Sequence, residues 1–200
     1  MAQRRTTARD LAQIAIFAAL IAALGLPGSI TIGSTGVPIT LQTLGVMLAG
    51  GILGARKGFL AVLVFLVLTT AGLPLLAGGR GGVGVWTGPS AGYLVGFLAG
   101  AVAVGLLTAR ILPKYPLWQG IAVNLIGGAL VIYVFGVTWL AIRTSWGPAI
   151  TGVFAYLPGD VLKAVVAALV AKQVHRSIPG LIVPTSASAP PPPTGWKVAS

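Results

Sequence analysis

The sequence predicts an all-α integral membrane protein, folded as a bundle of six transmembrane helices with both chain termini in the cytoplasm. Of its 200 residues, 56% are hydrophobic and 8% are charged, whereas charged residues make up about 25% of an ordinary soluble domain. A soluble core of this size cannot hide so much apolar side chain, so we expect the bilayer to be the solvent. The length allows one compact bundle rather than several domains.

Six apolar runs are the candidate spans. A membrane-crossing helix needs about 20 apolar residues, and the second and third runs are short by that measure. The first run could pass for a signal peptide, but further apolar runs follow it and its exit lacks a small-residue cleavage site. The expected spans are Leu11–Leu26, Leu41–Ala55, Gly58–Leu73, Pro89–Ala109, Leu117–Ile142 and Ala149–Ala171.

The basic residues predict the orientation of these spans. The chain has 13 Lys+Arg against 2 Asp+Glu, a formal net charge of +11, but the basic residues lie singly or in pairs between apolar runs. That placement is typical of topology signals rather than of a nucleic-acid surface. If the N-terminus is cytoplasmic and all six runs cross, Arg80 and Arg143 face outward and Lys163 lies inside the last span. The cytoplasmic side then receives the other ten: Arg4, Arg5, Arg9, Arg56, Lys57, Arg110, Lys114, Lys172, Arg176 and Lys197.

The chain divides into a membrane domain and a tail. Residues 1–176 hold the six spans. Residues 177–200 include a stretch rich in Pro, Ser and Ala, so we expect this segment to be a disordered cytoplasmic tail.

Asp160 and Lys163 are the ionisable residues inside a predicted span. They follow Pro158-Gly159 and lie three residues apart on one helical face, and Asp160 sits about 18 Å from Lys172 along a helix. Ionisable residues at such depth usually face a polar cavity or a partner. One interpretation is that Asp160 caps a half-helix that opens after Pro-Gly, with Lys163 as counter-ion. The other is that the two side chains bind a ligand in an outward pocket; both can hold together.

A few further polar residues are candidates. Gln42 stands where an apolar residue is expected, after a hydroxyl-rich loop, and Asn124 lies in the fifth span, where it could bind ligand or a neighbouring helix. Arg80 lies in the glycine-rich loop Ala77–Tyr93 and is a plausible carboxylate partner or a solvated loop charge. That loop lacks the Lys-Ser/Thr ending of a phosphate-binding P-loop.

Several classes of chemistry are excluded by composition. With one histidine, two acidic residues and no cysteine, the chain cannot assemble a familiar metal site, an acid–base dyad or thiolate chemistry. We expect no catalytic residue, no metal and no cofactor. A stripe of small residues in the first span, Ala15, Ala19 and Ala23, lets another helix approach closely, although simple alanine abundance also accounts for it.

Four motifs in order resemble the BioY family, the biotin-binding S components of energy-coupling factor (ECF) transporters. They are PITLQT after the first span, GGVGVWTGPSAGYLVGF before and into the fourth, YVFGVTWL in the fifth and LPGDVLK in the sixth. The resemblance covers roughly Leu11–Lys172. The family's usual Gly-Pro-Thr-Gly-Gly-Tyr appears here as Gly88-Pro89-Ser90-Ala91-Gly92-Tyr93, and both changes are to similarly small residues.

The resemblance implies a six-helix S-component fold with a biotin pocket near the outer face. By that likeness Asp160, Lys163 and Asn124 bind the ureido ring and Gln42 approaches from a lid. We also expect Tyr93 and Arg80 in the substrate site, with Arg80 as the carboxylate partner by separate inference from its chemistry. The alanine stripe would dock on a transmembrane coupling subunit that works with separate ABC-type ATPase subunits, because this chain carries no nucleotide-binding motif. The expected function is high-affinity biotin uptake across the cytoplasmic membrane. The alternatives are an S component for another vitamin or, in a different class, a membrane enzyme acting on lipid.

Overall fold

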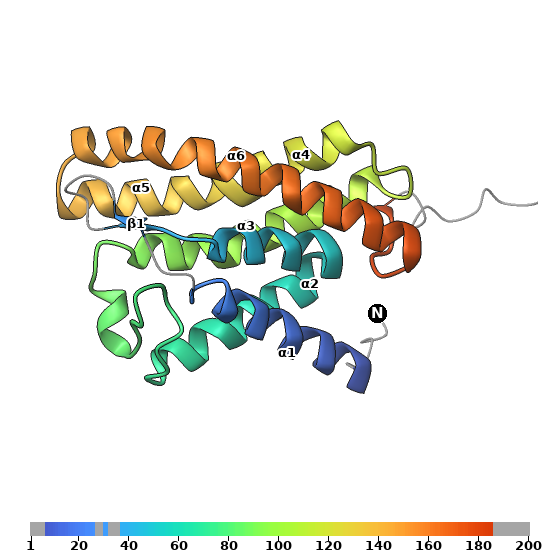
Figure 1. Ribbon diagram of the computed structural model, residues 1–200, viewed down its shortest axis with the longest axis horizontal. Helices are drawn as coiled ribbons and strands as arrows, with labels where there is room; N and C mark the ends of the chain where they lie inside the picture. The colour runs from blue at the N-terminus through green and yellow to red at the C-terminus, as the bar shows by residue number, and fades with distance from the viewer. Residues whose placement is uncertain (1–6, 27–29, 32–36, 186–200) are drawn as a thin grey trace, which may run out of the picture.

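The computed structural model describes residues 7–26, 30–31 and 37–185, and these residues are almost entirely helical. A short antiparallel pair, β1 (Ile30–Thr31) with β2 (Pro38–Ile39), joins the first two helices. A 3-10 turn, η1 (Val83–Trp86), and a π-helical turn, η2 (Ile126–Leu130), interrupt the rest. The helices run along the long axis of the molecule (Figure 1): α1 (Ala8–Ala23), α2 (Gln42–Thr70), α3 (Ala91–Ile111), α4 (Leu117–Leu125), α5 (Val131–Arg143) and α6 (Trp146–Ser177).

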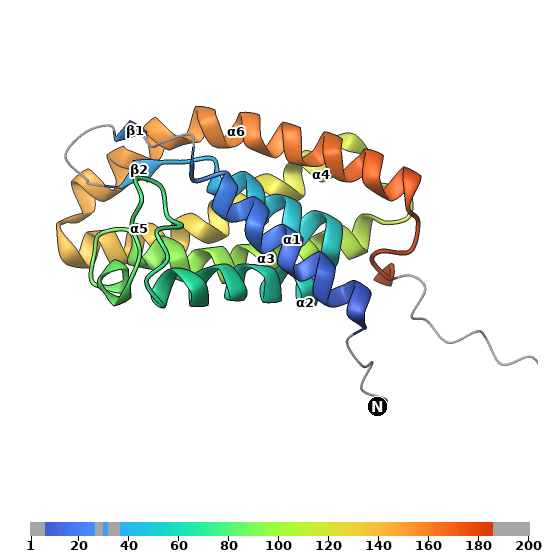
Figure 2. The same ribbon diagram turned by 60° about the horizontal axis from the view of Figure 1, so that its bottom comes forward.

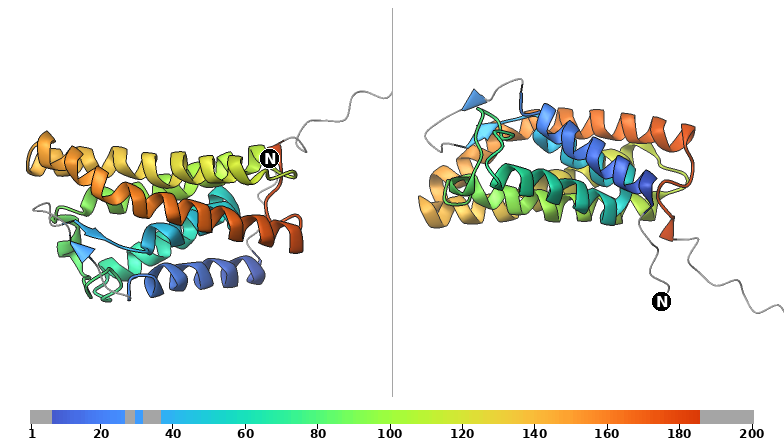
Figure 3. Two further views of the ribbon diagram at one scale, coloured as in Figure 1. Left: turned by 45° about the horizontal axis from the view of Figure 1, so that its top comes forward. Right: turned by 90° about the horizontal axis from the view of Figure 1, so that it is seen from below.

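Helix α1 begins at a capping box and lies at the edge of the bundle. The Thr7 hydroxyl accepts from the Asp10 backbone N–H at 3.2 Å, and the Asp10 carboxylate accepts from the Thr7 N–H at 3.1 Å, which satisfies two N-terminal donors. One face of α1 is buried against α2 through Ile14, Ala18 and Ile21. Figure 3 shows α1 on the opposite side of the bundle from α4 and α5.

The three alanines of the predicted docking stripe lie on the outward face of α1. Ala15, Ala19 and Ala23 are all exposed, as is Ile16 beside them. The stripe therefore does not serve packing within this chain. Its docking role remains a prediction.

Helix α2 reverses direction at Gly54. The φ angle of Gly54 is +82°, a left-handed value that glycine adopts without steric cost. A Cβ built on Gly58 would lie 2.9 Å from the carbonyl oxygen of Ala49, whereas nine residues of straight helix cover about 13.5 Å. The chain therefore folds back on itself. The two arms of α2 correspond to the predicted short spans Leu41–Ala55 and Gly58–Leu73.

Helix α6 is continuous from Trp146 to Ser177, with Pro158 inside it. The expectation that a half-helix opens after Pro158-Gly159 is wrong, so Asp160 is not an N-cap. A proline within a membrane helix is tolerated where local adjustments satisfy the freed carbonyl groups.

The length and composition of four helical segments allow them to cross a membrane: Gln42–Thr70, Ala91–Ile111, Leu117–Arg143 and Trp146–Ser177. The third of these comprises α4, η2 and α5, in line with the single predicted span Leu117–Ile142. Helix α1 has 16 residues, which is about 24 Å of helix. These apolar helices identify a membrane protein.

The two ends of the bundle differ in charge. The strands, η1 and the α5–α6 junction lie at one end, which we call the loop end (Figure 2). The start of α1, the α3–α4 connection and the end of α6 lie at the other, the basic end. Of the described residues, Arg80 and Arg143 belong to the loop end. The start of α1, the bend of α2, the α3–α4 connection and the end of α6 carry the other basic residues near the basic end: Arg9, Arg56, Lys57, Arg110, Lys114, Lys172 and Arg176. Arg4, Arg5 and Lys197 lie outside the described residues.

The described chain continues past Ser177 and packs at the basic end. Ile182 is 8% exposed, and a Cβ added to Gly54 would lie 3.3 Å from it. Lys57, next to the same bend, forms a 3.2 Å salt bridge with Asp10 of α1. Residues 186–200 of the predicted tail lie outside the described residues.

Candidate functional site

A cavity opens near the loop end. It lies between the first turn of α2, the loop that connects α2 to α3, and the helices α3, α5 and α6. Its empty volume, which includes the space open at the mouth, is about 630 Å³. Much of its wall is apolar, including Leu76, Leu94, Phe97 and Ile132. Five of the six predicted substrate-binding residues line it: Gln42, Arg80, Tyr93, Asp160 and Lys163.

Asp160 and Lys163 form a buried ion pair in the cavity wall. The Lys163 Nζ lies 2.8 Å from the Asp160 Oδ1, and the two residues are only 6% and 4% exposed. Both project from α6 at i, i+3, so one helical face presents an acceptor and a donor together. A buried pair is stable only when further hydrogen bonds satisfy its remaining polar atoms.

Tyr133 and Thr43 supply those further bonds. The Tyr133 hydroxyl donates to the Asp160 Oδ2. The Thr43 hydroxyl lies 3.4 Å from the Asp160 Oδ1 and accepts from the Lys163 Nζ at 3.1 Å. The pair is thus held by the start of α2 and by α5. The carboxylate can still accept, and the ammonium can still donate, through capacity these bonds leave unused.

The π-helical turn η2 places Tyr133 at the cavity. A π turn adds a residue to the helix and changes which side chains share a face. Gly128, Ile132 and Tyr133 all line the cavity across this turn. Gly128 has no room for a side chain, because an added Cβ would lie 2.4 Å from Met47.

Arg80 stands in a different part of the cavity wall, on the loop between α2 and α3. Its Nε donates to the Ala77 carbonyl at 3.2 Å, and its Nη1 donates to the Ser90 hydroxyl at 3.2 Å. Within the described part of the chain no acidic side chain pairs with it. A guanidinium carries five N–H donors, so donors remain for an anionic ligand.

The same loop is fastened to neighbouring helices. The Trp86 indole donates to the Thr70 hydroxyl at 2.9 Å, and the Trp139 indole donates to the Gly88 carbonyl at 2.9 Å. Arg143 donates to the Thr87 carbonyl and stacks over Trp139. The loop that carries Arg80 is therefore held in place on the side of α5.

Gln42 is buried and its amide bonds three backbone groups. The Nε2 donates to the carbonyls of Leu75 at 3.0 Å and Ile21 at 3.3 Å, and the Oε1 accepts from the Ala77 N–H at 3.3 Å. A carboxamide has two donor hydrogens and two acceptor lone pairs, so one acceptor position remains. Its contact with a ligand stays a prediction.

Tyr93 and Asn124 have different positions. The Tyr93 hydroxyl is buried in the cavity wall without a hydrogen-bond partner among the described residues, so it can bond a ligand there. Asn124 is 1% exposed and donates to the Gly120 carbonyl one turn earlier at 2.9 Å. It is not among the residues that line the cavity, so the structure does not bring it together with the other five.

The cavity residues that sequence reasoning missed include Thr43, Tyr133 and Tyr156. Thr43 follows Gln42 directly and Tyr133 opens the motif YVFGVTWL, so both lay inside segments that the sequence marked. Tyr156 donates to the Val37 carbonyl at 3.3 Å. No spacing rule would have found Tyr133, because its position depends on the π turn.

The cavity suits a ligand with three chemically different parts. The Asp160–Lys163 pair can bind a group that both donates and accepts, the apolar wall can cover a hydrocarbon body, and Arg80 can bind an anion. Within residues 7–26, 30–31 and 37–185 no group of three His, Cys, Asp or Glu side chains could hold a metal ion.

Comparisons with a family model, with curated proteins and with solved structures all match this chain to biotin transport proteins. The model of the BioY family matches residues 1–180. The chain is 48% identical to the biotin transporter BioY of Rhizobium etli over 86% of this chain and 95% of that protein. It is 44% identical to the biotin transporter BioY of Rhodobacter capsulatus over 88% and 97%. A solved S component for biotin from an ECF-type ABC transporter superposes with a TM-score of 0.80 at 29% identity, covering 88% of this chain and 95% of that one.

Proposed function

Since this chain belongs to the BioY family, we propose that it binds biotin and takes it up as the substrate-specific S component of an ECF-type transporter. The resemblance seen in the four sequence motifs is thereby confirmed. The chain is a transport protein and not an enzyme. The lipid-processing alternative has no support, because the family model, the curated relatives and the solved structure that the chain matches are all those of biotin transport proteins.

The composition of the cavity wall is the observation that carries the proposal. Biotin has a ureido group that both donates and accepts, an apolar ring and chain, and one carboxylate. The Asp160–Lys163 pair, 2.8 Å apart and buried, matches the ureido group. Phe97, Ile132 and the other apolar residues match the body. Arg80, without an acidic partner among the described residues, matches the carboxylate.

Equilibrium binding of biotin to the purified protein in detergent tests this function. We expect saturable binding of one biotin per chain, and competition by unlabelled biotin but not by thiamine or riboflavin. Binding of another vitamin in place of biotin would move the chain to a different substrate. Absence of any vitamin binding by a folded sample would contradict the proposal.

We further propose six membrane helices with both termini on the cytoplasmic side of the cytoplasmic membrane. The reversal of α2 at Gly54 divides α2 into two arms, which with α1, α3, the α4–α5 rod and α6 make six. Seven described basic residues at one end against two at the other support this orientation, since cytoplasmic ends carry the excess of Lys and Arg. The cavity then opens outward. Uptake also needs a coupling subunit and ATPase subunits.

Cysteine labelling checks this orientation, because the chain has no native cysteine. Gly147→Cys places an exposed thiol at the loop end, and Lys114→Cys places one at the basic end. An impermeant maleimide added to intact cells should label position 147 and not position 114. Permeabilised cells should show both. Labelling of position 114 alone in intact cells would invert the orientation.

A further inference from the structure

The loop that carries Arg80 contains a tight hairpin closed by its own backbone. The Leu76 N–H donates to the Arg80 carbonyl at 3.0 Å, and the Arg80 N–H donates to the Leu76 carbonyl at 3.2 Å. Gly78 and Gly79, with φ of +79° and +69°, make the turn, and a side chain would strain both positions. The direction in which Arg80 leaves this hairpin therefore depends on how the hairpin itself is held.

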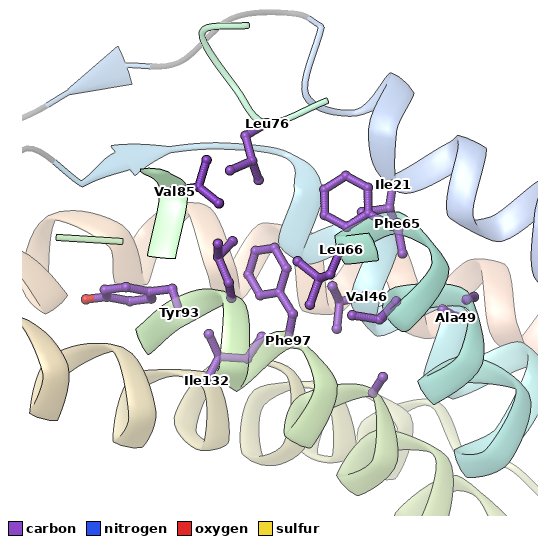
Figure 4. Close-up of a cluster of buried hydrophobic side chains, with 14 of the residues drawn as sticks. Ile21, Val46, Ala49, Phe65, Leu66, Leu76, Val85, Tyr93, Phe97 and Ile132 are labelled. Carbon is purple, nitrogen blue, oxygen red and sulfur yellow. The ribbon is translucent and has the colours of Figure 1, made fainter. Parts of the chain in front are cut away.

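Gln42 holds the hairpin on the side away from Arg80. Its amide donates to the Leu75 carbonyl at 3.0 Å and accepts from the Ala77 N–H at 3.3 Å. These two groups lie on either side of Leu76. The side-chain amide therefore bonds the hairpin in the pattern that the backbone of a residue in a neighbouring parallel strand would use. Leu76 itself is 4% exposed and belongs to the buried cluster in Figure 4.

The bonds continue from Gln42 to Arg80 without a gap. The Ala77 N–H donates to Gln42, and the Ala77 carbonyl accepts from the Arg80 Nε at 3.2 Å. The second Nε2 hydrogen of Gln42 donates to the Ile21 carbonyl in the last turn of α1 at 3.3 Å. The site is also tight, since a Cβ added to Gly25 would lie 2.9 Å from the Gln42 Nε2. Three of the four hydrogen-bonding positions of the amide are thus used by the protein.

We infer that Gln42 is a positioning residue, which aims Arg80 at the ligand carboxylate by fixing the Leu75–Arg80 hairpin to the end of α1. This rests on the proposed function, in which Arg80 binds the carboxylate of biotin. The buried amide is then a determinant of the preference for an anionic ligand rather than a direct ligand contact. Its loss leaves the Asp160–Lys163 pair intact, because no bond joins Gln42 to either residue among the described contacts.

The test compares biotin with biotinamide, in which a neutral carboxamide replaces the carboxylate. A charged hydrogen bond to Arg80 should make the wild type prefer biotin by about 10- to 100-fold. Arg80→Met should remove this preference. Gln42→Met, which keeps the length of the side chain, should lower this preference to nearly the same value. The double variant Gln42→Met/Arg80→Met should lose no more than Arg80→Met alone.

Gln13→Met is the matched control, because Gln13 bonds Lys57 at the basic end and should keep the full preference. If Gln42→Met does not fold, Gln42→Asn, with a shorter stem, gives the same comparison. Equal loss of affinity for both ligands in the Gln42 variant would overturn the inference, and so would a wild type that does not prefer biotin. A wild type that binds neither ligand would instead refute the proposed function.

Discussion

Asp160→Asn and Lys163→Met should each weaken biotin binding by about 30-fold to several thousand-fold. Each change removes one partner of a pair that is 2.8 Å apart and more than nine-tenths buried. Loss of one partner in a desolvated site leaves the other without compensation, at about 2–5 kcal/mol, and 1.4 kcal/mol is one decade of affinity. Titration with biotin measures the change. The expected loss is among the largest because both residues are proposed to contact the ureido group directly.

A melting temperature alone cannot separate ligand binding from structural support at this pair. Either single change leaves an unpaired buried charge and should lower the melting temperature. The double variant Asp160→Asn/Lys163→Met carries no charge there and should melt above both single variants. It should nevertheless bind biotin as weakly as they do. A double variant with restored stability and near-normal affinity would show that the pair only stabilises the fold.

The sequence predicted the helical spans well because apolar runs and charges are local signals. The two arms of α2 and the α4–α5 rod lie where the apolar runs lie. The break at Pro158 was wrong for a physical reason: a proline usually ends a helix in water, whereas α6 continues through it within the packed bundle. Periodicity had no way to indicate that the surroundings would tolerate this proline.

The candidate site was predicted in part. Asp160 and Lys163 stood out because ionisable residues are rare in apolar runs, and the structure adds their partners Thr43 and Tyr133. Tyr133 depends on the π turn η2, which sequence spacing does not reveal. Gln42 was singled out because it is polar at an apolar position, but which groups it bonds depends on the fold of the loop after α2. Asn124 is not among the residues that line the cavity, and its contact with biotin stays a prediction.

Ala19→Trp should reduce biotin uptake by about tenfold or more while leaving biotin affinity near that of the wild type. Ala19 is exposed on α1, between Ala15 and Ala23, on the face opposite the buried Ile14, Ala18 and Ile21. We propose that the coupling subunit docks on this small-residue face, where helix backbones can approach closely. An indole ring there separates the helices, and 1.4 kcal/mol of lost docking is already a tenfold effect.

Uptake of labelled biotin by cells that also express the coupling and ATPase subunits measures the effect, and binding to the purified variant measures affinity. Leu106→Trp is the control, because Leu106 is 55% exposed on α3 and carries the same ring on a different helix. That variant should transport normally.

Since the α1 stripe is on the outside of the bundle and the cavity residues belong to other elements, a docking defect should not alter the ligand site. Normal uptake by Ala15→Trp, Ala19→Trp and Ala23→Trp alike would exclude the stripe as the docking surface, whereas lost uptake with lost binding would indicate a damaged fold.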